Sequence, residues 1–183
     1  MSDHLIPGFL HLFFLILMPC FFTSKTLSQS SHGILRRIMD PSKDEYAYVN
    51  AEGDTVIPFG KYPFCFTEKF DKLAIVATRD DGIIGIDRNE NILFNVFVFD
   101  NGPDYLSNGL FRIVKDGKIG YADRNGKVVI EPQFDGAYPF KNGIAEVGKG
   151  CQILKEGEHS RWAGGEWYLI NKKGNIIRKI SRQ

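Results

Sequence analysis

The stretch that decides the fold is IGYADRNGKVVIEPQF at residues 119–134, which is followed by YPFKNGIAEV at residues 138–147. Asp123 and Gly126 bound a four-residue segment between two apolar runs. An Asx residue favours the start of a turn and glycine takes left-handed backbone, so the runs are expected to pair as a β-hairpin. Pro132 ends that pairing because it has no N–H to donate. A connector with aromatic residues then leads to a third short strand.

The pieces of this unit recur along the chain. The opening strand and its turn return as YAYVNAEG from residue 46, IGIDRNE from residue 84 and WYLINKKG from residue 167. The closing strand returns at residues 73 and 110, besides its copy at residue 144. Two independent markers that keep nearly one period, about 36 residues, indicate an internal repeat. Glu90 replaces the turn glycine in the second copy, which is one residue shorter by this alignment and predicts a different turn there.

The repeat predicts an all-β fold, an array of about 3.5 to 4 short antiparallel hairpin or three-strand units that bury their apolar faces by stacking. The array is expected to be either open or partly closed, like a propeller or barrel. The last copy stops after its second strand and is interpreted as a terminal half-repeat. Units are expected near residues 46–82, 83–117, 118–150 and 166–180, within a repeat domain at 45–183, and residues 151–165 form an inserted surface loop or hairpin.

The third copy resembles the WG-repeat family, whose consensus is similar to K-W-G-Y-I-D-x-x-G-K-x-V-I-x-P-x-(F/Y)-D followed by P-F-x-x-G-L-A-x-V. The resemblance covers roughly residues 45–180. The Trp-Gly signature is Ile119-Gly120 in this copy, and no copy keeps both residues. The family is mostly bacterial, often carries export signals and generally has no assigned activity. The resemblance therefore implies a repeat scaffold, with no catalytic residue to carry over.

An apolar run precedes the repeats. Residues 9–18 read FLHLFFLILM, and the apolar character continues to Phe22. We expect residues 1–24 to be a signal peptide or an N-terminal membrane anchor through residues 5–22, with a buried core helix as the alternative. Residues 25–44 are expected to be a linker with a short helix or strand at 34–39. The predicted location is therefore exported (periplasmic, surface or secreted) or membrane-anchored, with this segment as the only membrane contact.

The composition limits which kinds of binding partner and which site chemistry are expected. The chain has 183 residues with 23 Lys plus Arg against 22 Asp plus Glu, so no broad basic surface attracts nucleic acid. Cys65 and Cys151 are either paired in an oxidising compartment or two separate packed thiols. His32 and His159 are interpreted as solvated. Neither a metal nor a cofactor is expected.

One candidate binding site stands out in the inserted segment. Trp162, Arg161 and Tyr168 are predicted to form a patch for a sugar or a peptide, since Trp and Arg are favoured at binding hot spots. Trp167 is expected in the repeat core. Oxygen-bearing residues Asp100, Asp104 and Asn108 alternate as in a calcium loop, but ordinary turn chemistry is the favoured interpretation.

The function predicted from these features is a non-catalytic binding or scaffolding module at the bacterial cell envelope, with a protein or glycan partner. Two alternatives stay open. One is a glycan-acting hydrolase whose carboxylates are brought together by the fold. The other is a small adaptor or immunity-type partner protein, which an exposed apolar patch would indicate.

Overall fold

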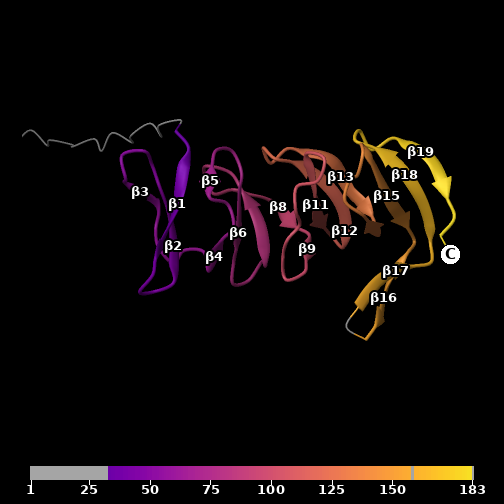
Figure 1. The fold of residues 1–183 in the computed structure, drawn as a ribbon, viewed down its shortest axis with the longest axis horizontal. Coiled ribbons are helices and arrows are strands. Elements are labelled where there is room, and N and C mark those ends of the chain that lie inside the picture. Colours follow the sequence, from indigo (N-terminus) through magenta and orange to yellow (C-terminus); the bar gives the residue numbers. More distant parts are fainter. Residues whose placement is uncertain (1–32, 158, 183) are drawn as a thin grey trace, which may run out of the picture. The chain divides into compact units, whose positions relative to one another are not determined.

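The computed structural model describes residues 33–157 and 159–182, and every regular element in this part is a β-strand. The strands form five antiparallel sheets, none of which closes on itself among these residues (Figure 1). The predicted all-β repeat fold is confirmed, in its open form. The predicted leader at 1–24, with Cys20, His32 and the first part of the predicted linker, lies outside the described residues.

The first sheet begins inside the predicted linker, with a strand at the place where a short helix or strand was expected, residues 34–39. Its order is β3-β2-β1-β5, with β1 at Leu35–Asp40, β2 at Glu45–Val49, β3 at Thr55–Ile57 and β5 at Lys69–Phe70. The predicted linker at 25–44 therefore needs correction. From Leu35 onward it belongs to the repeat domain, because Leu35 is buried and pairs with Phe70.

A seven-stranded sheet forms the middle of the described chain. Its order is β13-β12-β11-β8-β7-β6-β4, so the pairing of β8 with β11 joins two neighbouring units into one sheet. Its strands are β4 (Phe64–Cys65), β6 (Ala74–Ala77), β7 (Ile83–Ile86), β8 (Ile92–Val96), β11 (Leu110–Lys115), β12 (Lys118–Asp123) and β13 (Val128–Phe134).

The remaining strands form one larger and two small sheets. The larger has the order β14-β15-β18-β19 and the small ones are the pairs β9–β10 and β16–β17. The pair β16–β17 is the insertion predicted at 151–165, and Figure 1 shows that it extends beyond the ends of β15 and β18. These strands are β9 (Val98–Phe99), β10 (Gly102–Pro103), β14 (Gly136–Ala137), β15 (Ile144–Lys149), β16 (Gln152–Glu156), β17 (His159–Ala163), β18 (Glu166–Asn171) and β19 (Ile176–Ile180).

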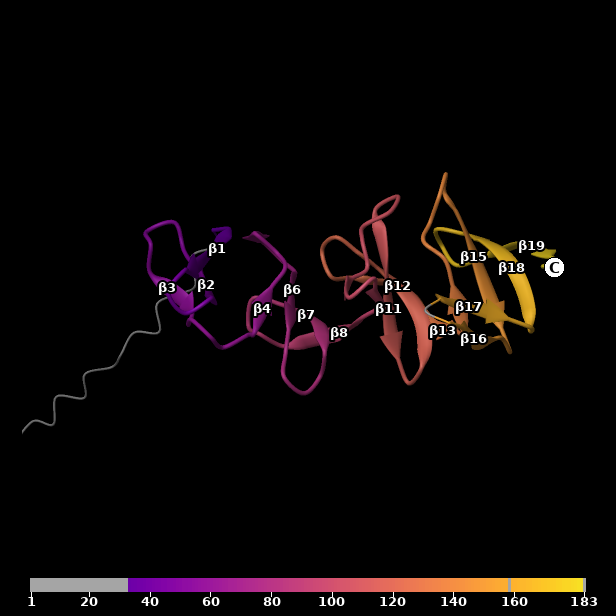
Figure 2. The same cartoon turned by 60° about the horizontal axis from the view of Figure 1, so that its bottom comes forward.

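The three-strand unit differs in phase from the predicted one. The three strands predicted to close a copy each pair with the opening strand of the next copy, and β1, from the predicted linker, pairs in the same way with β2. The result is four meanders, β1-β2-β3, β6-β7-β8, β11-β12-β13 and β15-β18-β19. The views in Figures 1 and 2 agree that these strands lie side by side. The last unit is therefore a complete meander and not the predicted half-repeat, since β15 supplies its first strand.

All four hairpin turns share one geometry. Asn50, Asp87, Asp123 and Asn171 each donate a backbone N–H to the carbonyl four residues ahead, at 2.9–3.1 Å. The residue three ahead has positive φ in each case, including Glu90 at 62°. The prediction of a different turn at Glu90 was wrong, because this side chain tolerates the left-handed backbone that glycine takes in the other three units.

Aligning the turns also corrects the repeat register in the second unit. Gly85 pairs with Phe94 two positions before the turn residue Asp87, as Tyr121 pairs with Ile130 in the third unit. Gly85 therefore corresponds to Tyr121 and not to Gly120, and the second unit is not shortened. The Phe94 ring fills the space above Gly85, where a Cβ atom would lie 2.5 Å from Cε2 of that ring.

Both cysteines of the described chain are buried free thiols. Cys65 packs in a cluster with Leu35, Tyr48 and Phe70, whereas Cys151 lies against Gly136 in the last sheet. Burial raises the pKa of Cys65 to about 11. Of the two alternatives left open by the sequence, the structure has separate packed thiols. Within 33–157 and 159–182, no helix is long and apolar enough to cross a membrane.

Gly120 lies where β12 and β13 approach each other closely. A Cβ atom there would lie 2.4 Å from the carbonyl oxygen of Ile130 and 2.6 Å from the nitrogen of Pro132, and neither backbone atom can rotate away. We expect Gly120→Ala to lower the free energy of unfolding by roughly 2–3 kcal/mol, measured by urea denaturation. Gly102→Ala is the matched control, since the nearest atom to its added Cβ is at 3.9 Å. Equal stability of the two variants would contradict the observed packing.

Candidate functional site

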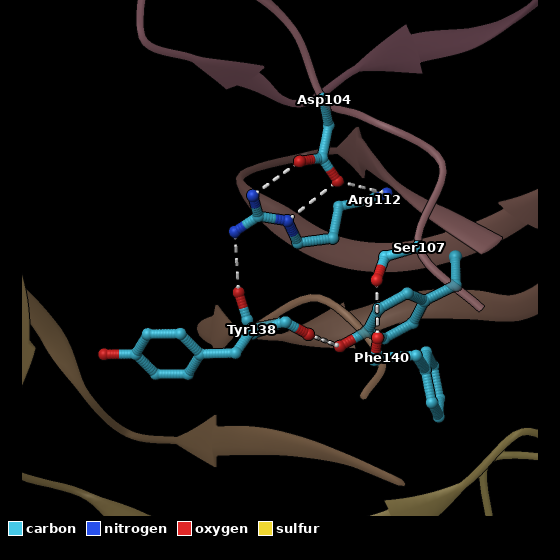
Figure 3. A network of polar contacts seen from close by, with 7 residues as sticks. Asp104, Ser107, Arg112, Tyr138 and Phe140 are labelled. Carbon is cyan, nitrogen blue, oxygen red and sulfur yellow. Dashed lines mark hydrogen bonds and ion pairs between the residues drawn. The ribbon is translucent and has the colours of Figure 1, made fainter. Parts of the chain in front are cut away.

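Asp104 and Arg112 form an ion pair that is almost completely removed from solvent (Figure 3). Arg112 Nη2 donates to Asp104 Oδ1 at 2.6 Å, and Nε donates to Oδ2 at 2.9 Å. The backbone N–H of Arg112 donates to the same Oδ2 at 2.8 Å. Each buried charge depends on the other, because an unpaired charge in this position would be strongly unfavourable.

Arg112 also links its strand to the last sheet. It lies in β11, and its Nη1 donates to the carbonyl oxygen of Ala137 in β14 at 3.0 Å. The ring of Phe97 covers the guanidinium, with its centroid 4.1 Å from Cζ. One side chain therefore fixes a carboxylate from the loop after β8, an aromatic ring and a backbone carbonyl at the same place.

The loop at residues 97–109 is held at two further points. The Ser107 hydroxyl donates to the carbonyl oxygen of Phe140 at 2.7 Å (Figure 3). The side-chain oxygen of Asn108 accepts the N–H of Gly143 at 2.8 Å. The calcium arrangement considered for this segment is not what the structure shows, since Asp104 binds Arg112 and Asn108 binds backbone. Among the described residues, no group of three or more His, Cys, Asp or Glu is placed to hold a metal ion.

The anchored loop leaves apolar side chains in solvent. Val98, Phe99, Tyr105 and Leu106 are each about half exposed. The rings of Phe99 and Tyr105 contact each other edge to face, with centroids 6.0 Å apart. We call these four residues the apolar patch. Because the loop is tied down by buried contacts, they do not fold inward.

Tyr105 also borders a concavity of about 760 Å³. Among the described residues that line it, Glu146 is the only one with a carboxylate, while Lys141 and Arg182 supply positive charge. The concavity therefore combines aromatic, amide and charged groups. It is lined by Tyr105, Ser107, residues 138–142 and 144–146, Leu169 and Arg182.

A cluster of aromatic rings adjoins the concavity at Tyr138, which is one of its lining residues. Tyr138 and Trp167 have centroids 5.9 Å apart, and Trp162 adds a third ring at 5.1 Å from Tyr138 and 6.4 Å from Trp167. The guanidinium of Arg182 lies over Trp167 and Tyr138, with Cζ at 4.2 and 4.6 Å from the ring centroids. Glu146 Oε2 is 3.5 Å from Arg182 Nε.

The three residues predicted as a patch take different positions. Trp162 is half-buried against Phe97, Tyr138 and Trp167, and its Nε1 is buried without a hydrogen-bond partner among the described residues. Arg161 is exposed on β17. The Tyr168 hydroxyl donates to Glu166 at 2.6 Å, which raises its pKa. The structure thus brings Trp162 to the core residue Trp167, which is 2% exposed as predicted. Binding by Trp162, Arg161 and Tyr168 stays a prediction.

Sequence reasoning missed the pair of network residues that recurs in the first and third meanders. Arg37 and Arg112 each donate to a connector carbonyl, that of Cys65 and that of Ala137. The equivalent tyrosines behave alike: Tyr48 donates to the carbonyl of Thr67 and Tyr121 to that of Tyr138, both at 2.7 Å. Burial raises the pKa of both phenols, so they remain protonated donors. The sequence signal that could have revealed this network is an arginine in the strand before the opening strand, at the position that pairs with the tyrosine: Arg37 with Tyr48 and Arg112 with Tyr121.

The four meanders place the described chain in the class of β-repeat proteins with open sheets. The family model of the WG containing repeat matches residues 119–150, which run from β12 to the end of β15. The chain therefore contains a WG repeat at these residues. No curated protein and no solved structure matches it.

The buried ion pair gives a stability prediction. Asp104→Asn keeps the shape of the side chain but leaves the Arg112 charge buried without a carboxylate. We expect the free energy of unfolding to fall by about 3–5 kcal/mol, measured by urea denaturation followed by tryptophan fluorescence. Lys118→Gln is the control, because it removes an exposed ion pair with Asp135 and should cost less than about 1 kcal/mol. A loss at Asp104 no larger than the control would mean that the pair is not buried in solution.

Proposed function

We propose that this repeat protein is a non-catalytic binding module that recognises a protein partner through the apolar patch and the adjoining concavity. The observation that carries the proposal is the anchored display of Phe99 and Tyr105, which stay half exposed although the loop below them is fixed by a buried ion pair. Exposed aromatic side chains on a rigid support are typical of protein interfaces, where Tyr and Arg are frequent hot spots.

A protein partner fits the chemistry of the surface better than a glycan. The patch includes the aliphatic side chains Val98 and Leu106 beside its two rings, and sugars offer little apolar surface to match them. The concavity next to it supplies polar groups, namely Ser107, Asn142 and Lys141, for the rim of such an interface. A glycan stacked on Tyr105 is the competing outcome of the binding test.

The absence of a second carboxylate supports the non-catalytic part of the proposal. Hydrolysis of a glycosidic bond usually needs two carboxyl groups that flank the bond. Among the described residues that line the concavity, only Glu146 carries one, and its Oε2 is 3.5 Å from Arg182 Nε. This arrangement favours binding over hydrolysis at this place.

The proposed location is the bacterial cell envelope. The support is the apolar run through residues 5–22, which has the length of a signal-peptide core or a short membrane anchor. The bacterial assignment follows from the WG-repeat resemblance. A repeat domain that is delivered outside the cytoplasm would meet its protein partner at the cell surface or in the periplasm.

The binding site can be tested with the full-length chain purified in mild detergent. A peptide display library and a glycan array are the probes. We expect peptide binders, and we expect Phe99→Ser combined with Tyr105→Ser to weaken them at least tenfold by biolayer interferometry. Ile153→Ser combined with Leu154→Ser is the control, because both residues are exposed apolar side chains on the β16–β17 hairpin. Glycan binding that depends on Tyr105 would mean that the ligand is a glycan and not a protein. Peptide binding that is unchanged in the Phe99 and Tyr105 variant would refute the apolar patch as the binding site.

The location can be tested by expressing the full-length gene in a bacterium with a C-terminal tag. We expect the product either in the periplasm or medium with a shortened N-terminus, or in the membrane fraction at full length. Fractionation and intact mass measure both. A full-length product in the cytosol would contradict the envelope proposal and turn residues 9–22 into a core or partner-binding element.

A further inference from the structure

The C-terminal tail places the cation of Arg182 over the rings of Tyr138 and Trp167, beside the concavity. Arg182 follows β19, whose last paired residue is Ile180, opposite Trp167. Its guanidinium stacks over Trp167 and Tyr138, its Nη2 donates to the Tyr138 hydroxyl at 3.1 Å, and Glu146 lies beside its Nε. The Arg182 side chain is still 33% exposed, so solvent reaches this contact.

The groups that receive Arg182 do not come from the tail. Glu146 lies in β15 and Trp167 in β18, two strands that pair along six residues. Trp167 is further fixed by its Nε1, which donates to the carbonyl oxygen of Gly164 at 2.9 Å. Tyr138 follows β14, and its backbone carbonyl accepts the Tyr121 hydroxyl. The groups that contact Arg182 are thus held in place by contacts that do not involve the tail.

Aromatic faces next to a carboxylate are a chemically selective receptor. Rings attract cations through their negative faces, and a carboxylate supplies the opposite charge. A planar guanidinium fits stacked rings and a carboxylate better than a compact ammonium does.

We propose that Tyr138, Trp167 and Glu146 form a guanidinium-binding site, that Arg182 is its internal occupant, and that an arginine of the protein partner takes the same place when it binds. This inference rests on the proposed function for the partner, but the site itself does not. The tail closes the site in the free protein, and a tethered occupant acts as a competitor at high effective concentration. The partner is therefore a protein with an exposed arginine.

The experiment uses the full-length chain in mild detergent and Nα-acetyl-arginine amide as the probe, with tryptophan fluorescence and NMR as readouts. We expect Arg182→Ala to bind the probe at least tenfold more tightly than the unaltered chain, because the internal competitor is gone. Arg182→Lys should fall between the two. Nα-acetyl-citrulline amide, which is uncharged and nearly the same shape, should not bind either protein.

Two further measurements make the result decisive. Arg182→Ala combined with Glu146→Gln should lose at least tenfold of the gained affinity, and a thermal melt establishes that each variant is folded. In the unaltered chain, excess probe should shift the NMR signal of the Arg182 Nε–H. Absence of probe binding to folded Arg182→Ala, or equal binding of citrulline, would overturn the site.

The outcome is separable from that of the proposed function. Probe binding to Arg182→Ala together with peptide binders that ignore the apolar patch would keep the guanidinium site and refute the proposed partner surface. Patch-dependent peptide binders without arginine, together with no probe binding, would keep the partner surface and refute the guanidinium site.

Discussion

The buried pair of Asp104 and Arg112 is the interaction on which the position of the apolar patch depends. Two opposite charges that are hidden from water are stable only while they hold each other in good geometry. Here that requirement fixes the loop at residues 97–109 against β11 and, through the carbonyl of Ala137, against β14. The position of Tyr105, and with it one wall of the concavity, follows from this electrostatic constraint.

Arginine and tyrosine have the same contacts in the first meander as in the third, but the arginine of the first meander has no buried carboxylate partner. Arg37 occupies the position of Arg112 and donates to the connector carbonyl of Cys65, but its acidic neighbour Glu68 is largely exposed, at 3.6 Å. Exposed ion pairs contribute little, since water screens both charges. The described chain therefore uses one scaffold contact twice, and of these two places it buries the charge pair only at the one beside the apolar patch.

The sheets show that one copy of the sequence repeat is not an independent folding unit. The second, third and fourth meanders each begin with a strand that the sequence groups with the preceding copy, so neighbouring copies share strands. The connectors then cover the sheet faces with aromatic side chains, as Phe140 does against Tyr121 at 4.7 Å and Phe70 against Tyr48 at 5.3 Å. In both cases the covering ring comes from the connector that leads to the next meander, so the packing of one meander depends on the chain that continues into the next.

The sequence by itself determined the all-β class, the three hairpin turns that have glycine, at Asn50, Asp123 and Asn171, the inserted segment and the core position of Trp167. These follow from local chemistry, since Asx and left-handed residues set turns and alternating apolar residues set strands. Only the tertiary structure decided the phase of the meander, the start at Leu35, the burial of Asp104 with Arg112 and the stacking of Arg182 on Trp167. Each of these depends on which segments distant in sequence come into contact. The charge or the aromatic ring of a residue does not by itself specify which distant residue it will contact in the folded chain.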